Sequence, residues 1–188
     1  GKWIFLQGSP VLSEKNGIKL GRLSGISAHY VPSYLLKNRM PSWETNCIED
    51  WETKVDAIVE ETHHEDMRLI GGIPPWVSMY YEKLIEKTGK KVGELFPNLK
   101  LFVYGGVNFE PYRTKLEALV GRSLPSVELY PASEGFFAFQ DRPEQKGMLL
   151  QLQSGIFYEF VAADQFFDDN PPRLSIGEVA RDTNYVML

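Results

Sequence analysis

The stretch from residue 67 to residue 76 reads Met-Arg-Leu-Ile-Gly-Gly-Ile-Pro-Pro-Trp, and its pattern returns at residues 101–112 as Leu-Phe-Val-Tyr-Gly-Gly-Val-Asn-Phe-Glu-Pro-Tyr. In both stretches a short apolar run predicts a strand, two glycines end it, and a proline opens a helix with one apolar face. Two such units in succession imply a parallel sheet with right-handed crossovers. A third strand is predicted at residues 127–130.

Outside these two units, the periodicity of the apolar residues changes along the chain. Residues 1–30 are glycine-rich and strand-like, and from Ile48 the apolar residues recur at helical spacing, with Asn46 as the expected cap. After Ser133, strand-like runs alternate with turn-forming segments, at residues 136–139, 148–152, 156–161 and 178–188. The predicted fold class is α/β: a mixed, partly parallel sheet flanked by helices and followed by antiparallel β strands.

Composition argues against several classes of protein. The chain has 188 residues, with 20 Lys and Arg against 25 Asp and Glu, and its formal charge of −5 argues against nucleic-acid binding through phosphate neutralisation. Cys47 is the only cysteine, so an internal disulfide cannot form. The apolar runs are far shorter than the about 20 residues of a membrane helix. We therefore expect a soluble, cytoplasmic chain with neither a nucleic-acid nor a membrane partner.

Both ends of the sequence lie in strand-like runs. Gly1 is followed at once by an apolar segment, and the chain stops in the apolar run from Tyr185 to Leu188 without a polar tail. No internal repeat or long linker divides the chain. We expect residues 1–188 to be the central part of one larger domain, truncated at both ends.

Two segments that directly follow predicted strands have the composition of a ligand site. Gly105, Gly106 and Val107 follow one strand, and the missing Cβ atoms would let a flat ring or a ribose approach the main chain closely. Residues 130–134, Tyr-Pro-Ala-Ser-Glu, follow the next strand and combine an aromatic ring, a hydroxyl and a carboxylate. Because ligands bind beyond the carboxyl ends of parallel strands, both loops are expected on one rim.

Each of these patterns also has a purely structural interpretation. Two glycines after a strand commonly form only a turn, and a Ser-Glu pair commonly caps a helix or lies in a solvated turn. The residues from His63 to Asp66 are better explained as a solvated helix end than as a metal cluster, and Cys47 is not expected to be a nucleophile. Core packing explains Trp51 and Trp76 at helical spacing. The order and spacing of the two loops nevertheless favour a site.

The segment from Tyr130 to Glu134 resembles the Tyr-Ala-Ser-Ser-Glu motif of the auxin-inducible Gretchen Hagen acyl-acid amido synthetases, which belong to the adenylate-forming superfamily. A Gly-Gly loop precedes this motif in the superfamily at a spacing similar to that between Gly105 and Tyr130. Further matches are residues 71–76, 50–52 and 157–160. The agreement in order covers most of the chain and resembles the central part of the large N-terminal domain of a family member.

The resemblance implies ATP-dependent adenylation of a small carboxylic acid with Mg²⁺, followed by transfer of the acyl group to the amine of an amino acid. It implies no catalytic residue within this chain. The roles that it implies for single positions are a nucleotide site at Gly105, Gly106, Val107, Tyr130, Pro131, Ala132 and Ser133, metal binding by Glu134, and contact with the acyl substrate by Phe157.

Three departures from the family pattern matter. Pro131 replaces a small residue and removes one backbone donor. The family's upstream Ser/Thr/Gly-rich phosphate loop and its downstream Arg-x-Gly-Asp segment have no counterpart, so we expect no turnover from this chain alone. Two alternatives stay open: a ligase of the same superfamily that transfers the acyl group to a thiol such as coenzyme A, and a non-catalytic relative that only binds a carboxylate or acts as an interaction module.

Overall fold

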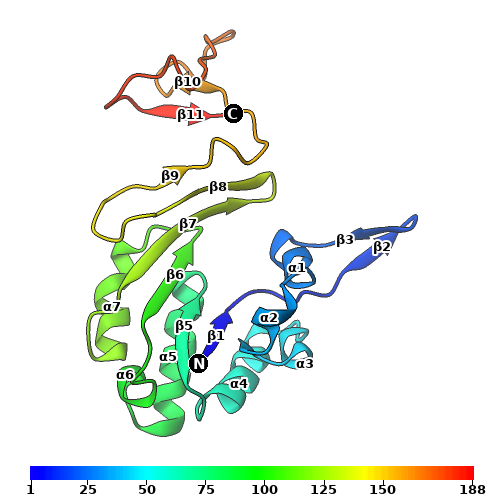
Figure 1. Cartoon of the computed structure of the whole chain (residues 1–188), viewed down its shortest axis with the longest axis vertical. Coiled ribbons are helices and arrows are strands. Elements are labelled where there is room, and N and C mark those ends of the chain that lie inside the picture. Colours follow the sequence, from blue (N-terminus) through cyan, green and yellow to red (C-terminus); the bar gives the residue numbers. More distant parts are fainter. The chain divides into compact units, whose positions relative to one another are not determined.

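A seven-stranded mixed sheet organises residues 1–150 of the computed structural model, which describes residues 1–188 as two compact units (Figure 1). The strand order is β4-β1-β5-β6-β7-β8-β9. The first five of these strands run parallel, and β8 and β9 are antiparallel to their neighbours. In spatial order, the strands are β4 (Arg39–Met40), β1 (Lys2–Phe5), β5 (Met67–Gly71), β6 (Leu101–Gly105), β7 (Ser126–Ala132), β8 (Gly135–Phe139) and β9 (Leu149–Leu150).

Helices connect the parallel strands, and a two-stranded hairpin projects between β1 and the first helix (Figure 1). The hairpin is formed by β2 (Ser13–Lys15) and β3 (Ile18–Leu20). The helices are α1 (Leu23–Ala28), α2 (Ser33–Leu36), α3 (Trp43–Asn46), α4 (Trp51–Thr62), α5 (Pro74–Thr88), α6 (Val92–Leu95) and α7 (Glu110–Val120). The expected α/β fold with a mixed, partly parallel sheet is confirmed.

The order of the strands reverses at β1. The chain leaves β1 for β4 on one side, and then returns past β1 to β5 and continues outward to β6 and β7 on the other side. In an open parallel sheet, such a reversal leaves a crevice beyond the carboxyl ends of the two adjacent strands. The crevice forms because the connections that follow these strands leave toward opposite sides of the sheet. The crevice in this fold lies beyond the ends of β1 and β5.

The core lies between the sheet and helices α4 to α7. Ile4, Ile70 and Phe102 are in register across β1, β5 and β6, and all three are buried. Because side chains alternate along a strand, Trp3 points to the other face. There its indole Nε1 donates to the carbonyl of Leu35 in α2 (3.2 Å), so that α1 and α2 lie on the opposite side of β1 from α4.

Local sequence explains where the long helices begin and end. Asp50, not Asn46 as expected, caps α4: its carboxylate accepts from the backbone amide of Thr53 (2.8 Å). Asn46 is instead the last residue of the short helix α3, which ends before α4 begins. Prolines occupy the first turn of α5 and of α7, and each helix ends at a left-handed glycine, Gly89 and Gly121.

Four expected strand regions are shorter than the sequence suggested. Of residues 148–152 only Leu149–Leu150 pair, as β9, and of residues 156–161 only Phe160 and Val161 pair, as part of β10 (Phe160–Ala162). Residues 1–30 and 178–188 also pair only in part. Residues 1–30 form three strands but also helix α1, whose six residues bury only Gly25 and Ala28. Of residues 178–188, only Tyr185–Met187 pair, as β11. The strands expected near 136–139 and 127–130 are confirmed as parts of β8 and β7.

Residues 151–188 form the second unit. Strands β10 (Phe160–Ala162) and β11 (Tyr185–Met187) pair antiparallel, and Phe160 also bridges to Leu174. The expectation that residues 1–188 belong to one larger domain stays a prediction. Among the helices, none has the length and apolar character that crossing a membrane requires.

Candidate functional site

A cavity of about 340 Å³ lies at the crevice where the strand order reverses. We call it the rim cavity. Its walls come from the ends of four parallel strands and from the start of α5, with Leu6, Ile73, Trp76, Val103 and Leu129 as apolar members. Gln7, Arg22 and Ser24 contribute polar groups. A mainly apolar cavity with a few polar groups at such a reversal point is typical of a small-molecule site.

Gly105 ends β6 at the edge of the rim cavity and has no room for a side chain. It is in register with Leu129 of β7, and a Cβ at this position would collide with the carbonyl oxygen of Leu129. Gly106 follows with φ +80°, a left-handed conformation that glycine adopts without strain. Val107 is 40% exposed in the bend after these glycines. Gly106 is exposed as well, and the part in nucleotide binding that the resemblance implies for this loop stays a prediction.

Residues 130–132 are part of strand β7 and not of a loop. The pairing of β7 with β8 shifts register between Tyr130 and Pro131, so the missing N–H of the proline falls at a bulge. Pro131 lines the rim cavity together with Gly105. The Tyr130 side chain does not line this cavity; its ring packs edge-on against Phe137, with centroids 5.3 Å apart.

Ser133 and Glu134 form the two-residue turn between β7 and β8, flanked by Ala132 and Gly135. Both are exposed, and neither lines the rim cavity. Glu134 is thus a solvent-facing carboxylate, neither sealed in the core nor ion-paired. The chain has no group of three His, Cys, Asp or Glu side chains placed to hold a metal ion.

Phe157 lies in the second unit, and its side chain is 81% exposed. The contact with an acyl substrate that the family resemblance implies for this residue stays a prediction.

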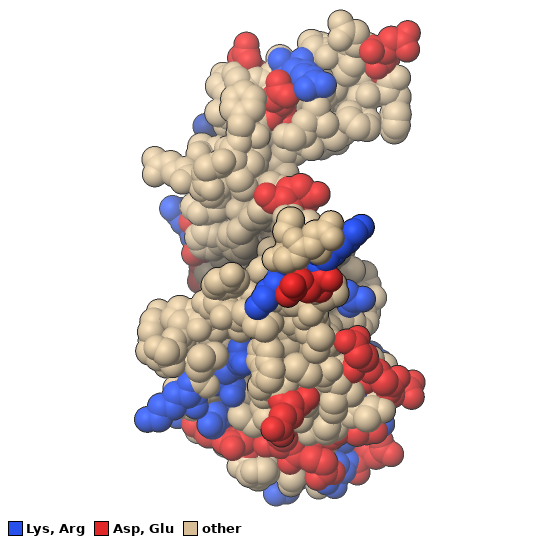
Figure 2. Space-filling view, turned by 90° about the vertical axis from the view of Figure 1, so that its right-hand side faces the viewer, with Lys and Arg blue, Asp and Glu red and all other residues tan.

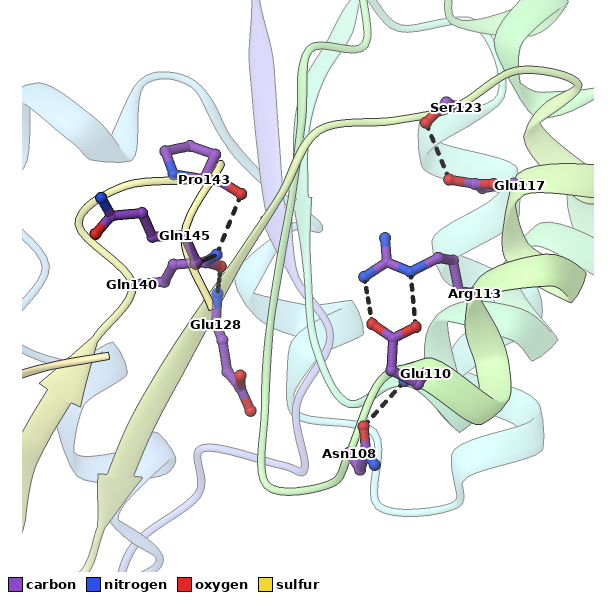
Figure 3. Close-up of polar contacts among 9 residues, drawn as sticks. All are labelled: Asn108, Glu110, Arg113, Glu117, Ser123, Glu128, Gln140, Pro143 and Gln145. Carbon is purple, nitrogen blue, oxygen red and sulfur yellow. Dashed lines mark hydrogen bonds and ion pairs between the residues drawn. The ribbon is translucent and has the colours of Figure 1, made fainter. Parts of the chain in front are cut away.

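A polar network that the sequence did not reveal lies next to Gly106 (Figure 3). Arg113 of α7 donates to both carboxylate oxygens of Glu110 (2.8 and 3.2 Å), and the Asn108 side chain accepts from the backbone amide of Glu110 (3.0 Å). The Arg113 guanidinium also lies 4.5 Å from the centre of the Phe109 ring. These contacts fix the start of α7 directly after the glycine loop.

The Tyr104 hydroxyl lies close to the carboxylate of Glu128, its neighbour in register on β7. Burial, and then the negative charge of Glu128, raise the pKa of Tyr104 above its usual value. The backbone amide of Glu128 donates to the side chain of Gln140 (3.2 Å), which in turn holds the loop after β8 (Figure 3). From the sequence, the alternation of side chains could only suggest that Tyr104 and Glu128 lie on the same face of the sheet. The register of β6 and β7 shows that the two residues are direct neighbours.

Charge on the surface is mixed. Acidic and basic side chains both occur on the face shown in Figure 2, which carries no continuous basic surface. Three of the seven ion pairs link neighbouring helices, such as Lys87 with Glu60 between α5 and α4. On this face the charges do not form the basic stripe that binding of a nucleic-acid backbone requires.

The fold and the rim cavity define an α/β protein with a ligand-sized cavity at the reversal of its strand order. Comparison of the chain with known protein families and with curated proteins gives no match.

Proposed function

We propose that this chain is the nucleotide-binding part of an ATP-dependent acyl-acid amido synthetase. The observation that carries the proposal is the convergence of the two motif segments: Gly105 and Pro131, which are far apart in the sequence, line one cavity at the switch point of the sheet. A substrate carboxylate would attack the α-phosphorus of ATP, pyrophosphate would leave, and the amine of an amino acid would then displace AMP. With ATP as co-substrate, the reaction belongs in the cytoplasm.

The residues divide into three groups by proposed role. The exposed main chain at Gly105, Gly106 and Val107 would border the adenine, and the polar and small groups from Tyr130 to Ser133 would line the rest of the nucleotide. The apolar wall of the rim cavity, formed in part by Ile73 and Val103, suits the body of a small carboxylic acid. For Phe157 of the second unit, contact with the acyl substrate stays the role that the family resemblance implies.

The chemistry of Glu134 fits Mg²⁺. Mg²⁺ prefers oxygen ligands and is commonly held by one or two carboxylates together with substrate phosphates and water. A single exposed carboxylate at the β7–β8 turn meets that requirement without a preformed protein cage. Bound there, Mg²⁺ would neutralise charge on the phosphates of ATP.

The test is ATP–pyrophosphate exchange by the full-length protein that contains this chain, against a panel of carboxylic acids. We expect exchange with at least one acid, and a loss of about 100-fold or more in Glu134→Ala because the metal would be lost. Glu144→Ala is the matched control, since Glu144 is also an exposed glutamate in a loop of the same unit. Absence of exchange with every acid would refute adenylation and favour the non-catalytic carboxylate binder.

The acceptor is identified in a second assay. With the acid that supports exchange, we expect AMP release to be accelerated by an amino acid. Acceleration by coenzyme A alone would refute the amido synthetase and identify the thiol-acylating alternative.

A further inference from the structure

The hairpin that projects between β1 and α1 carries the only Asn-Gly pair of the chain (Figure 1). Its strands, β2 and β3, pair only with each other, and every residue of both strands is exposed. Asn16 and Gly17 form the two-residue turn between the strands, with φ of 53° and 77°. An isolated two-stranded hairpin is marginally stable in water, so this one should open more easily than the rest of the fold.

The side-chain amide of Asn16 and the main-chain nitrogen of Gly17 are both unprotected. The two residues are exposed, and neither of these groups makes a hydrogen bond with another residue. A Cβ on Gly17 would meet no atom within 4 Å. Because glycine has no side chain, another group can approach its main chain closely. The chain has six further asparagines, and each of them precedes a residue that has a side chain.

We propose that Asn16 is a site of covalent modification, at which the side chain loses its amide nitrogen and the main chain is rerouted. When the hairpin opens, the nitrogen of Gly17 loses its proton to hydroxide and attacks Cγ of Asn16. The new bond joins this nitrogen to Cγ, the bond from Cγ to Nδ2 breaks, and the amide nitrogen takes up a proton and leaves as ammonia. A five-membered succinimide ring remains.

Water then opens the succinimide at either of its two carbonyl groups. Attack at Cγ gives an aspartate with an ordinary main chain. Attack at the main-chain carbonyl of residue 16 gives an isoaspartate, in which the chain runs through Cβ and Cγ. Water is the only co-reactant that is consumed, and the modification does not depend on the proposed adenylation.

The two products differ in their effect on the hairpin. Each adds one negative charge to a chain whose formal charge is −5. The isoaspartate also inserts one carbon atom into the main chain of the turn, and the geometry of a two-residue turn sets the register of its strands. We therefore expect isoaspartate to disrupt the pairing of Lys15 with Ile18 beside the turn. Aspartate should preserve this pairing, because an Asp-Gly pair suits the same turn.

The hairpin is also part of the wall of a cavity of about 530 Å³. Ser13 and Leu20 are cross-strand partners, and both line this cavity. Trp51 of α4 and Trp76 of α5 line it as well. Loss of the hairpin register would therefore change the wall of a cavity that reaches the helices of the sheet.

The test is incubation of the folded protein in mildly alkaline buffer. Peptide mapping by mass spectrometry measures loss of the amide, and methylation by an isoaspartyl methyltransferase measures isoaspartate. Because an isolated hairpin opens at little cost, Asn16 should lose its amide within about tenfold of the rate in the protein unfolded by guanidinium chloride. A slower reaction would show that the folded hairpin protects the turn, and would overturn the proposal.

Asn184 is the internal control, because it is also exposed but precedes Tyr185. It should lose its amide more slowly than Asn16, and equal rates would contradict the role of the glycine. In Asn16→Gln, closure would need a six-membered ring, so residue 16 of this variant should stay unmodified over the period in which the wild type reacts.

Asn16→Asp separates the new charge from the rerouted main chain. Freshly prepared wild type and Asn16→Asp should both show the cross-strand contact between Ser13 and Leu20 by NMR. The isoaspartate fraction of the incubated wild type should lack it. Persistence of the contact in that fraction would overturn the proposed change of the cavity wall.

Discussion

The carbonyl oxygen of Leu129 occupies the space that a Cβ on Gly105 would need. The two residues are in register on neighbouring parallel strands, β6 and β7, at the edge of the rim cavity. Backbone atoms cannot move aside as a flexible side chain can. The glycine is therefore required by the pairing of the two strands, whatever ligand the cavity holds.

Gly105→Ala should therefore lower the free energy of unfolding by about 1–3 kcal/mol, which is the usual cost of adding a methyl group where the surrounding atoms are already closely packed. The measurement is urea-induced unfolding followed by circular dichroism. Gly177→Ala is the control, because a Cβ there meets no atom within 4 Å and the backbone needs no left-handed conformation. A Gly105→Ala variant as stable as the wild type would contradict the close approach.

Tyr80 and Tyr81 offer a matched pair of substitutions on α5. Both side chains are buried, but the Tyr80 hydroxyl shares a hydrogen bond with Thr62 (2.7 Å), whereas the Tyr81 hydroxyl has no partner. Tyr80→Phe should lower the free energy of unfolding by about 0.5–1.5 kcal/mol, the net worth of one hydrogen bond. Tyr81→Phe should leave it unchanged or raise it, because it removes an unsatisfied buried group. Equal losses in the two variants, measured by urea unfolding, would contradict this assignment.

The two strand–glycine–helix units could be predicted because their signals are local. The apolar run, the glycine pair and the helix-opening proline lie within about a dozen residues, and each acts on its own neighbours. The β2–β3 hairpin also has a local signal: Asn16 and Gly17, with φ of 53° and 77°, form the turn that joins its two strands. An Asn-Gly pair between two strand-like segments predicts such a hairpin.

The strand order and the burial of Lys54 could not be predicted, because they depend on contacts between distant residues. Nothing near Arg39 indicates that β4 pairs with β1 on the side away from β5. Lys54 lies in an amphipathic helix, where a lysine next to an apolar position is expected in solvent. Its burial depends on the carbonyls of Gln7 and Asn46, which the fold brings to it from other elements.

Glu61 should make the free energy of unfolding depend on pH in the acid range. Burial alone would raise the pKa of its carboxyl, but hydrogen bonds from the Thr45 hydroxyl and from the amide and hydroxyl of Ser42 outweigh burial and hold the pKa below its usual 4.5. A carboxyl whose pKa is lowered by folding contributes stability above pH 4.5, and this contribution is lost as pH falls through the folded-state pKa. Relative to the wild type, Glu61→Gln should therefore show a smaller loss of stability below pH 4.5.

The matched control for this titration is Glu86→Gln, at an exposed position on α5. Urea unfolding of the three proteins at several pH values between neutrality and the acid range provides the measurement. Parallel curves for the wild type and Glu61→Gln would show that the carboxyl does not titrate with folding.

Lys54 should make the free energy of unfolding depend on pH in the basic range. Burial lowers the pKa of its amine from 10.5 to about 8, against the smaller opposing influence of Cys47 and Glu49. Between these two values the unfolded chain binds the proton and the folded chain does not, so stability rises with pH across the window, by up to about 3 kcal/mol. Lys54→Met cannot show this rise and leaves two buried carbonyls without a donor, so the gap between wild type and variant should widen from pH 8 to pH 10.5. The substitution changes no other titratable group, so the contribution of the rest of the chain cancels in the difference. Lys115→Met, at an exposed lysine paired with Glu82, should follow the wild type throughout, and a constant gap for Lys54→Met would mean that the buried amine keeps its ordinary proton affinity.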